Sequence, residues 1–277
     1  YRCDIKKIDM VLPNHPVLYS SISITNTGSA PLRANAAWHN TVGSPFLESG
    51  CLIDVCANHF ATAVEDSEFN GTTRLAMGKE FNDLGKVPAK DGSTLDISVV
   101  PGMIGHTDFV TGSVPSETRL GWSSVLNPRL KMVYVSFFSG PSALSDDDIP
   151  LYFNNLWMQY GGRPMTPWAL YDGGTDQTFC LGVENSIGYY AEGLAKSVGI
   201  ETFLGHPTTV EIPAGATRFQ RYGTAFAPLD NPKMMNGIQS IEQSEEGIIL
   251  KHGKAWGFIE ADSSFTILKA IERKVLE

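Results

Sequence analysis

Residues 17–25 read Val-Leu-Tyr-Ser-Ser-Ile-Ser-Ile-Thr, and the turn-forming run Asn26-Thr27-Gly28-Ser29 follows them. Side chains of a strand alternate between two faces, and here one face is mainly apolar while the other is more polar. The stretch therefore predicts a half-buried strand. A second strand-like run extends from Pro31 to Trp38, so the two runs and the turn between them predict a hairpin.

The same alternation returns along the chain and is separated by turn residues, in keeping with 27 glycines and 16 prolines. Further strands are predicted at Lys131–Phe138, Gln177–Val183, Thr208–Ile212 and Thr217–Phe226, and a short hairpin at Gly247–Leu250 and Ala255–Ile259. Few segments show a residue pattern typical of a helix. Residues 150–159 fit a short helix or a strand, 186–196 a helical turn, and 262–275 a terminal helix or a last strand with a tail. We expect an all-β fold, a large antiparallel two-sheet sandwich, as one domain over residues 1–277.

Composition excludes several classes of protein. The 277 residues are 42% hydrophobic and 18% charged, which argues against intrinsic disorder. The net charge of −9, without a basic cluster, speaks against binding nucleic acid or an anionic membrane. No run approaches the roughly 18 apolar residues of a membrane span. The four cysteines fit no zinc or redox motif, so we expect four reduced, buried thiols, which favours the cytoplasm. Because a strand-like residue pattern begins immediately after Tyr1, we expect further strands before it.

Two segments place titratable side chains where predicted strands end. His39 lies in Trp38-His39-Asn40, and an imidazole there can donate a proton near neutral pH, while Asn40 offers a donor and an acceptor to a sugar hydroxyl. Glu184 follows the apolar run 179–183, and a partly desolvated carboxylate suits a general base. The alternatives are a histidine that satisfies loop carbonyls and a glutamate that faces water.

Other polar and aromatic residues are candidates for binding. His106 and Asp108 are two residues apart in a segment predicted to be extended, so their side chains point to the same face and suit binding to the hydroxyls of a polyol. They do not make a metal site without a third ligand, and we expect no metal. Trp157 is one of several tryptophans whose rings suit the apolar face of a sugar as well as a core. The chain has no GxSxG, P-loop, GxGxxG or HExxH motif, which excludes the corresponding hydrolases, nucleotide-binding enzymes and zinc proteases.

Taken together, these segments resemble the aldose 1-epimerase (galactose mutarotase-like) superfamily. Residues 22–32, Ile-Ser-Ile-Thr-Asn-Thr-Gly-Ser-Ala-Pro-Leu, are similar to a hairpin of that family, and the strand after it ends in an active-site histidine, matched here by His39. Leu181-Gly182-Val183-Glu184 matches the strand with the catalytic glutamate, and Asp108 matches an aspartate after a glycine-containing loop. The match covers about residues 17–227. It departs from the family after His39 and after Glu184, where the usual aromatic pair and the usual Thr-Gln or Pro-Gln are missing.

The resemblance implies that Glu184 is the base and His39 the acid in the interconversion of sugar anomers, that Asp108 and His106 hold hydroxyls, and that no cofactor takes part. A small sugar is then the partner. His39 and Glu184 should lie within about 8 Å of each other, so that each reaches its own proton on one sugar. Two further interpretations stay open: a carbohydrate-binding domain without catalysis, and a lyase or epimerase of a modified sugar. The sandwich fold alone does not decide among them.

Overall fold

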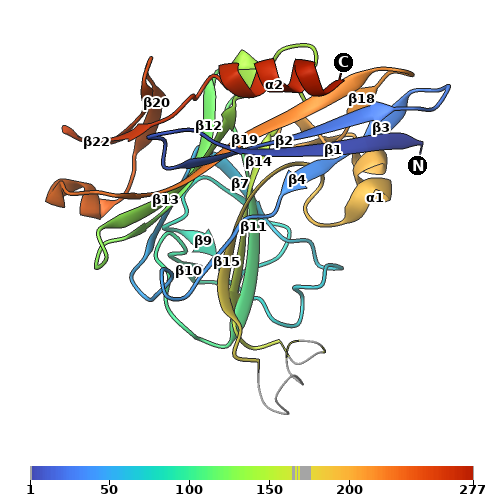
Figure 1. Cartoon of the computed structure of the whole chain (residues 1–277). Coiled ribbons are helices and arrows are strands. Elements are labelled where there is room, and N and C mark those ends of the chain that lie inside the picture. Colours follow the sequence, from blue (N-terminus) through green and yellow to red (C-terminus); the bar gives the residue numbers. More distant parts are fainter. Residues whose placement is uncertain (1, 164–165, 167, 169–175, 277) are drawn as a thin grey trace.

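Two antiparallel sheets face each other in the computed structural model, which describes residues 2–163, 166, 168 and 176–276 (Figure 1). The six-stranded sheet consists, in spatial order, of β1 (Cys3–Val11), β2 (Val17–Asn26), β19 (Thr217–Pro228), β13 (Met132–Ser139), β12 (Leu120–Asn127) and β6 (Leu52–Val55). The seven-stranded sheet consists of β4 (Ala36–Trp38), β15 (Phe179–Ile187), β14 (Phe153–Tyr160), β11 (His106–Ser113), β7 (His59–Thr62) and β8 (Glu80–Phe81), with β5 (Thr41–Gly43) also paired to β15. The predicted fold class is confirmed.

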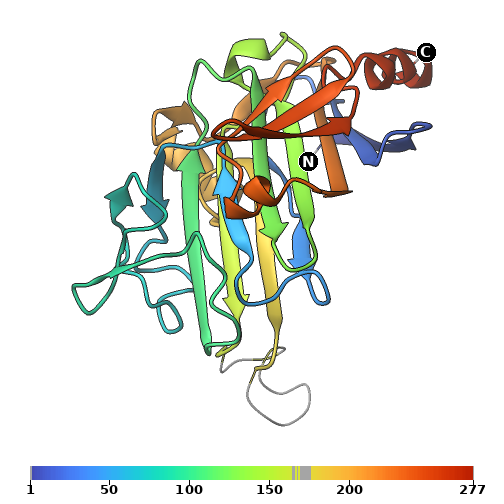
Figure 2. The same cartoon turned by 90° about the vertical axis from the view of Figure 1, so that its left-hand side faces the viewer.

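The remaining elements are short. They are the pairs β9 (Val87–Pro88) with β10 (Thr94–Leu95), β16 (Thr202–Phe203) with β17 (His206–Pro207), and β3 (Leu32–Ala34) with β18 (Val210–Ile212), the 3₁₀ turns η1 (Pro141–Ala143) and η2 (Pro232–Asn236), the helices α1 (Gly193–Ile200) and α2 (Thr266–Leu276), and the three-stranded sheet β20 (Ser240–Gln243), β21 (Gly247–His252) and β22 (Ala255–Glu260). Figure 2 shows the strands of the large sheets running side by side in the turned view.

The predicted strand at 17–25 is β2, but the predicted hairpin is wrong. β2 pairs with β1 and β19, whereas the run from 31 to 38 splits into β3, which pairs with β18, and β4, which pairs with β15 of the other sheet. The turn after β2 therefore carries the chain between sheets. The side-chain amide of Asn26 stabilises this turn, because its Nδ2 donates to the carbonyls of Ala30 at 2.8 Å and Ile212 at 2.9 Å.

The segments left open between helix and strand are now assigned. Residues 153–160 form strand β14, and 266–276 form helix α2. The turn expected at 186–196 is wrong in its first part, because β15 continues to Ile187 and α1 begins only at Gly193. The hairpin around His252 and Gly253 is confirmed as β21 and β22.

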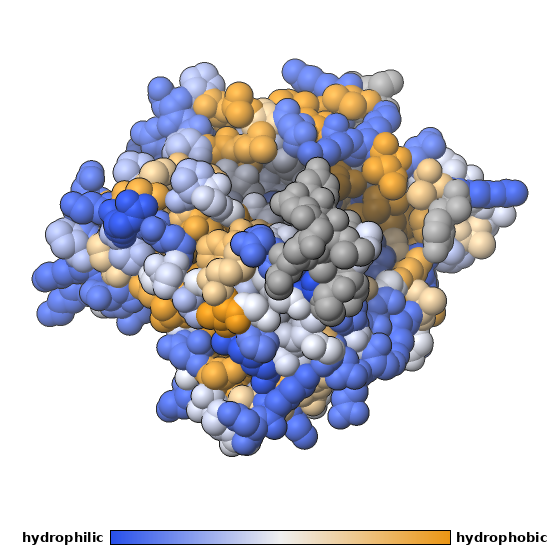
Figure 3. Space-filling view, turned by 90° about the horizontal axis from the view of Figure 1, so that it is seen from below, coloured by the Kyte–Doolittle hydropathy of each residue, from blue (hydrophilic) through white to orange (hydrophobic). Residues whose placement is uncertain are grey.

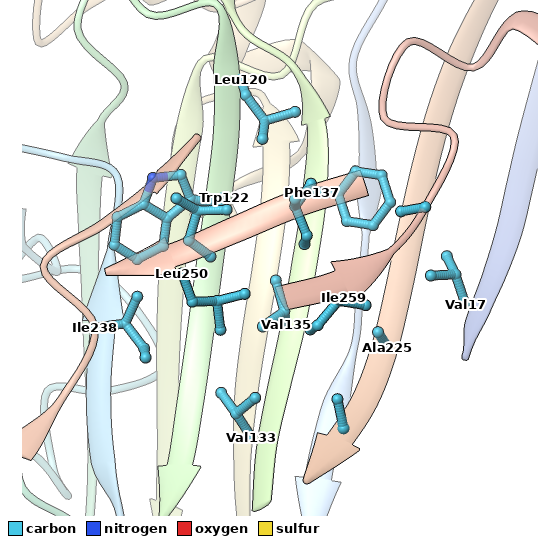
Figure 4. Close-up of a cluster of buried hydrophobic side chains, with 14 of the residues drawn as sticks. Val17, Leu120, Trp122, Val133, Val135, Phe137, Ala225, Ile238, Leu250 and Ile259 are labelled. Carbon is cyan, nitrogen blue, oxygen red and sulfur yellow. The ribbon is translucent and has the colours of Figure 1, made fainter. Parts of the chain in front are cut away.

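A third layer covers the six-stranded sheet. One face of that sheet carries apolar side chains such as Val133, Val135 and Phe137, and the sheet of β20–β22 lies across it with Leu250 and Ile259 pointing inward (Figure 4). Burial of such side chains stabilises the fold by roughly 25 cal/mol per Å². The two-layer expectation therefore omits a layer built from residues after 230, which pack into the same apolar cluster.

Helix α2 is fastened to the six-stranded sheet by buried charges. Arg221 of β19 contacts Glu272 of α2 at 2.8 Å and also pairs with Asp148, and all three side chains are almost inaccessible. The Ser21 hydroxyl of β2 donates to the same glutamate at 2.5 Å. Buried charges of this kind are tolerated because each is paired and hydrogen-bonded.

The surface is mixed in character. Hydrophilic residues cover much of the rim in the view from below, and hydrophobic residues lie among them (Figure 3). Among the described helices, none is long and apolar enough to cross a membrane. All four cysteines are free, but only Cys51 is buried, so the expectation of buried thiols is wrong for the half-buried Cys3, Cys56 and Cys180. The expectation that strands precede Tyr1 stays a prediction.

Candidate functional site

A cavity of about 330 Å³ lies on the face of the seven-stranded sheet that is turned away from the six-stranded sheet. Strand alternation builds it, because Leu156 and Met158 pack into the core between the sheets while Trp157 points the other way. Phe109 faces Trp157 across the β11–β14 pair. The lining residues are His39, Glu68, Phe69, Phe109, Trp157, Arg163, Trp168, Glu184 and Ala191.

Strand pairing brings His39 next to Glu184. β4 and β5 both pair with β15, with Trp38 opposite Asn185 and Thr41 opposite Gly182. His39 lies at the break between β4 and β5, directly beside Glu184. The strand does not end at Glu184, as the sequence predicts, but continues to Ile187, and the neighbouring strand is interrupted beside Glu184.

The two side chains are in direct contact. His39 Nδ1 lies 2.7 Å from Glu184 Oε1, and the His39 side chain is 58% exposed while that of Glu184 is 14% exposed. This hydrogen bond to Glu184 raises the pKa of His39 above its ordinary value, against the opposing effect of partial burial. The imidazole therefore keeps a proton to higher pH than a free histidine, and the carboxylate beside it fixes the direction of its Nδ1–H bond.

Aromatic rings form one wall of the cavity. The Trp157 ring lies 5.5 Å from the His39 ring and 5.8 Å from the Trp168 ring. Phe109 stacks on Phe69 at 5.0 Å. Such a wall offers a flat apolar surface next to the polar His39–Glu184 pair, which suits a ligand with one apolar and one polar side.

An arginine is enclosed by these rings. The Arg163 guanidinium carbon lies 5.6, 5.5 and 5.0 Å from the rings of Phe69, Trp157 and Trp168, and Nη1 donates to Glu68 at 3.2 Å. The rings stabilise the cation through their electron-rich faces. Arg163 and Glu68 thus add a second polar group to the cavity.

Sequence reasoning missed six of the lining residues: Glu68, Phe69, Phe109, Arg163, Trp168 and Ala191. Phe109 had a usable signal, because it lies next to Asp108 on a strand and must face the opposite side. Glu68 and Phe69 lie in a loop with no strand pattern, and only the tertiary structure brings them to the cavity.

Asp108 does not line the cavity. It lies on the opposite face of β11 from Phe109, is fully buried, and accepts hydrogen bonds from Arg74 Nε at 2.8 Å and from the Thr73 hydroxyl at 2.8 Å. Its carboxylate is thus occupied by an internal ion pair with Arg74. The expectation that Asp108 holds a sugar hydroxyl is contradicted by this position.

Two further predicted residues are also absent from the lining. His106 shares the face of β11 with Asp108, and its Nδ1 lies 3.3 Å from the Thr72 carbonyl. Asn40 points into the space between the sheets, where its Nδ2 donates to the Tyr222 hydroxyl at 2.7 Å. Of the predicted site residues, the structure therefore brings His39, Glu184 and Trp157 together and places Asn40, His106 and Asp108 elsewhere. Within residues 2–163, 166, 168 and 176–276, no group of three or more metal-ligating side chains is present.

No protein-family model matches the chain, and no curated protein matches it. A solved structure of a proposed aldose 1-epimerase from Klebsiella pneumoniae has a TM-score of 0.53 and 14% identity, and the match covers 85% of this chain and 49% of that one. A galactose mutarotase-like protein from Clostridium acetobutylicum has a TM-score of 0.48 and 11% identity, with 81% and 62% covered. The chain therefore spans about half the length of the Klebsiella protein, and the likeness to that protein shows the fold.

Proposed function

Since the chain has the galactose mutarotase-like fold, we propose that it binds a sugar in the cavity and interconverts the sugar's anomers. Glu184 is the general base and His39 the general acid. One observation carries this proposal: the two groups touch each other at 2.7 Å on the edge of an aromatic-lined cavity. Acid–base chemistry on one sugar carbon needs both groups within reach of that carbon.

The reaction requires one proton to leave and one to arrive. Glu184 takes the proton of the anomeric hydroxyl, the bond between the anomeric carbon and the ring oxygen breaks, and His39 gives its proton to that oxygen. This yields the open-chain aldehyde. After rotation of the aldehyde carbon, the ring hydroxyl attacks its other face. His39 takes back a proton and Glu184 returns one, so the other anomer forms and the protein is unchanged.

The charge state of the pair suits this sequence of steps. The raised pKa of His39 keeps the imidazole protonated nearer to neutral pH, as an acid requires. In the free protein the acid and the base bind each other. An anomeric hydroxyl and a ring oxygen, which share one carbon, replace that contact with two hydrogen bonds, one to each side chain.

The aromatic wall supplies the binding surface. Trp157 lies beside His39, so a sugar ring lying on Trp157 has its polar edge at the acid–base pair. Arg163 and Glu68 are near enough to the rings to take part in recognising hydroxyls.

One observation favours the binding domain without catalysis as the second candidate. Asp108, His106 and Asn40 lie outside the cavity, which leaves fewer groups to hold a sugar in position for catalysis than the sequence predicts. In this alternative, His39 and Glu184 stay hydrogen-bonded to each other and transfer no proton. They only offer hydrogen-bonding atoms to the sugar.

Polarimetry on freshly dissolved aldoses distinguishes the two candidates. Catalysis predicts that the protein speeds the change of optical rotation for one sugar in a panel of hexoses, pentoses and uronic acids. Binding alone predicts quenching of tryptophan fluorescence by a sugar without any acceleration. A protein that does neither with any sugar of the panel contradicts both candidates.

A further inference from the structure

Each of the two site residues is followed in sequence by an asparagine that points to the other side of the sheet. His39 and Glu184 face the cavity, whereas Asn40 and Asn185 face the space between the two large sheets. The two asparagine side chains meet at one atom there. Asn40 Nδ2 donates to the Tyr222 hydroxyl at 2.7 Å, and that hydroxyl donates to Asn185 Oδ1.

Tyr222 is held firmly in place. It belongs to β19 of the six-stranded sheet and is 1% exposed. Its ring stacks on Trp38 at 5.2 Å and 16° and on Phe138 at 6.1 Å and 8°. A side chain enclosed between two rings has little rotational freedom, so its hydroxyl is a fixed point that connects one sheet to the site on the other.

The two asparagines depend on this hydroxyl to different degrees. Asn185 has further partners, because its Nδ2 donates to the Ser123 hydroxyl at 3.1 Å and its Oδ1 accepts from the Ser136 hydroxyl at 3.1 Å. For the Asn40 side chain, the Tyr222 hydroxyl is the one hydrogen-bond partner found among the described residues. Loss of the Tyr222 hydroxyl therefore loosens the segment that carries His39 more than the segment that carries Glu184.

We propose that the Tyr222 hydroxyl is a positioning group that holds His39 in contact with Glu184 by way of Asn40 and Asn185. The regular pairing with β15 is interrupted at His39 and Asn40, between β4 and β5, so this segment depends on individual hydrogen bonds. The Asn40 carbonyl is bound by the Val183 amide at 2.8 Å, and its side chain is bound by Tyr222. The catalytic consequence rests on the proposed function, but the positioning itself does not.

The test replaces Tyr222 by phenylalanine, which keeps the stacked ring and removes the hydroxyl. The readout is the pKa of His39, followed by NMR titration of its ring. Since the contact with Glu184 raises this pKa, a loosened contact lowers it toward the ordinary value of 6.5. If the chain is a mutarotase, the rate of anomer interconversion falls by roughly 10-fold or more, because small misplacements of catalytic groups are costly.

Tyr160→Phe is the matched control. Tyr160 is as buried as Tyr222, and among the described residues its hydroxyl has no hydrogen-bond partner. This variant loses a buried hydroxyl without touching either asparagine, so the His39 pKa should not change. An equal fall of that pKa in both tyrosine variants overturns the proposal, and so does an unchanged pKa in folded Tyr222→Phe.

Asn40→Ala tests the same link from its other end and does not require a change in the core. It should lower the His39 pKa as Tyr222→Phe does, and the double variant should lower it little further, since both changes break one connection. Additive shifts overturn the proposal. If the wild-type protein interconverts no sugar and Tyr222→Phe still lowers the His39 pKa, the positioning stands and the proposed function fails.

Discussion

The Nδ1 atom of His39 and the Oε1 atom of Glu184 lie 2.7 Å apart, although 145 positions separate the two residues in the sequence. The contact arises because β4 and β5 pair with β15, so His39 becomes the cross-strand neighbour of Glu184. It joins a mostly exposed imidazole to a mostly buried carboxylate.

Replacing Glu184 by glutamine should reduce anomer interconversion roughly 10²-fold or more, in line with general acid–base catalysis. Glutamine keeps the shape and the hydrogen-bonding reach of the side chain but cannot accept the hydroxyl proton, so sugar affinity should change little. Polarimetry measures the rate. Glu80→Gln is a matched control, because Glu80 pairs with His59 at the same 2.7 Å outside the cavity. A Glu184→Gln protein as active as the wild type removes Glu184 from the mechanism.

The pKa of His39 should lie above 6.5 in the folded protein and should fall in Glu184→Gln, where the lowering effect of burial remains without the carboxylate. Because the folded-state pKa is the higher one, the pair's contribution to stability is complete below about pH 6.5 and is lost as pH rises through the folded-state pKa. Urea unfolding of both proteins at several pH values measures this. The difference in their free energies of unfolding should shrink toward high pH, and a constant difference contradicts the assignment.

Replacing Trp157 by alanine should weaken sugar binding roughly 10-fold, which corresponds to about 1.4 kcal/mol. The alanine removes the ring that lies between His39 and Arg163, whereas Trp157→Phe keeps part of the flat surface and should lose less. Isothermal titration with the sugar identified by polarimetry gives both affinities. Trp256→Ala serves as the control, since Trp256 is 62% exposed on β22 and does not line the cavity. Equal losses in Trp157→Ala and Trp256→Ala exclude stacking on Trp157.

Replacing Asp108 by alanine should destabilise the fold by about 3–5 kcal/mol, because it leaves the Arg74 guanidinium without its buried partner. The affinity of the folded protein for sugar should not change, since Asp108 lies behind the sheet from the cavity. Urea unfolding measures the first effect, and binding at low temperature measures the second. Asp91→Ala, at an exposed aspartate that binds only Ser93 among the described residues, should cost little stability. Weaker sugar binding by folded Asp108→Ala restores Asp108 to the site.

The fold class and several strands, among them β2, β13 and β19, could be predicted from the sequence, and the family resemblance added the expectation that His39 and Glu184 lie close together. Alternation with a period of two is a local property, so strands such as β2 and β13 can be read from their own residues. The family resemblance then implies which histidine and which glutamate share a task, and the structure brings these two together.

Which strands are neighbours and which face of each strand meets the cavity could not be predicted, because both depend on contacts between distant segments. Alternation shows that Asp108 and Phe109 point in opposite directions, but it does not show which of them is turned to the ligand. The partner of β2, the third layer over β13 and the meeting of Asn40 with Tyr222 depend in the same way on contacts between distant segments. A strand's own residues carry its period, while its neighbours are selected by the packing of the whole chain.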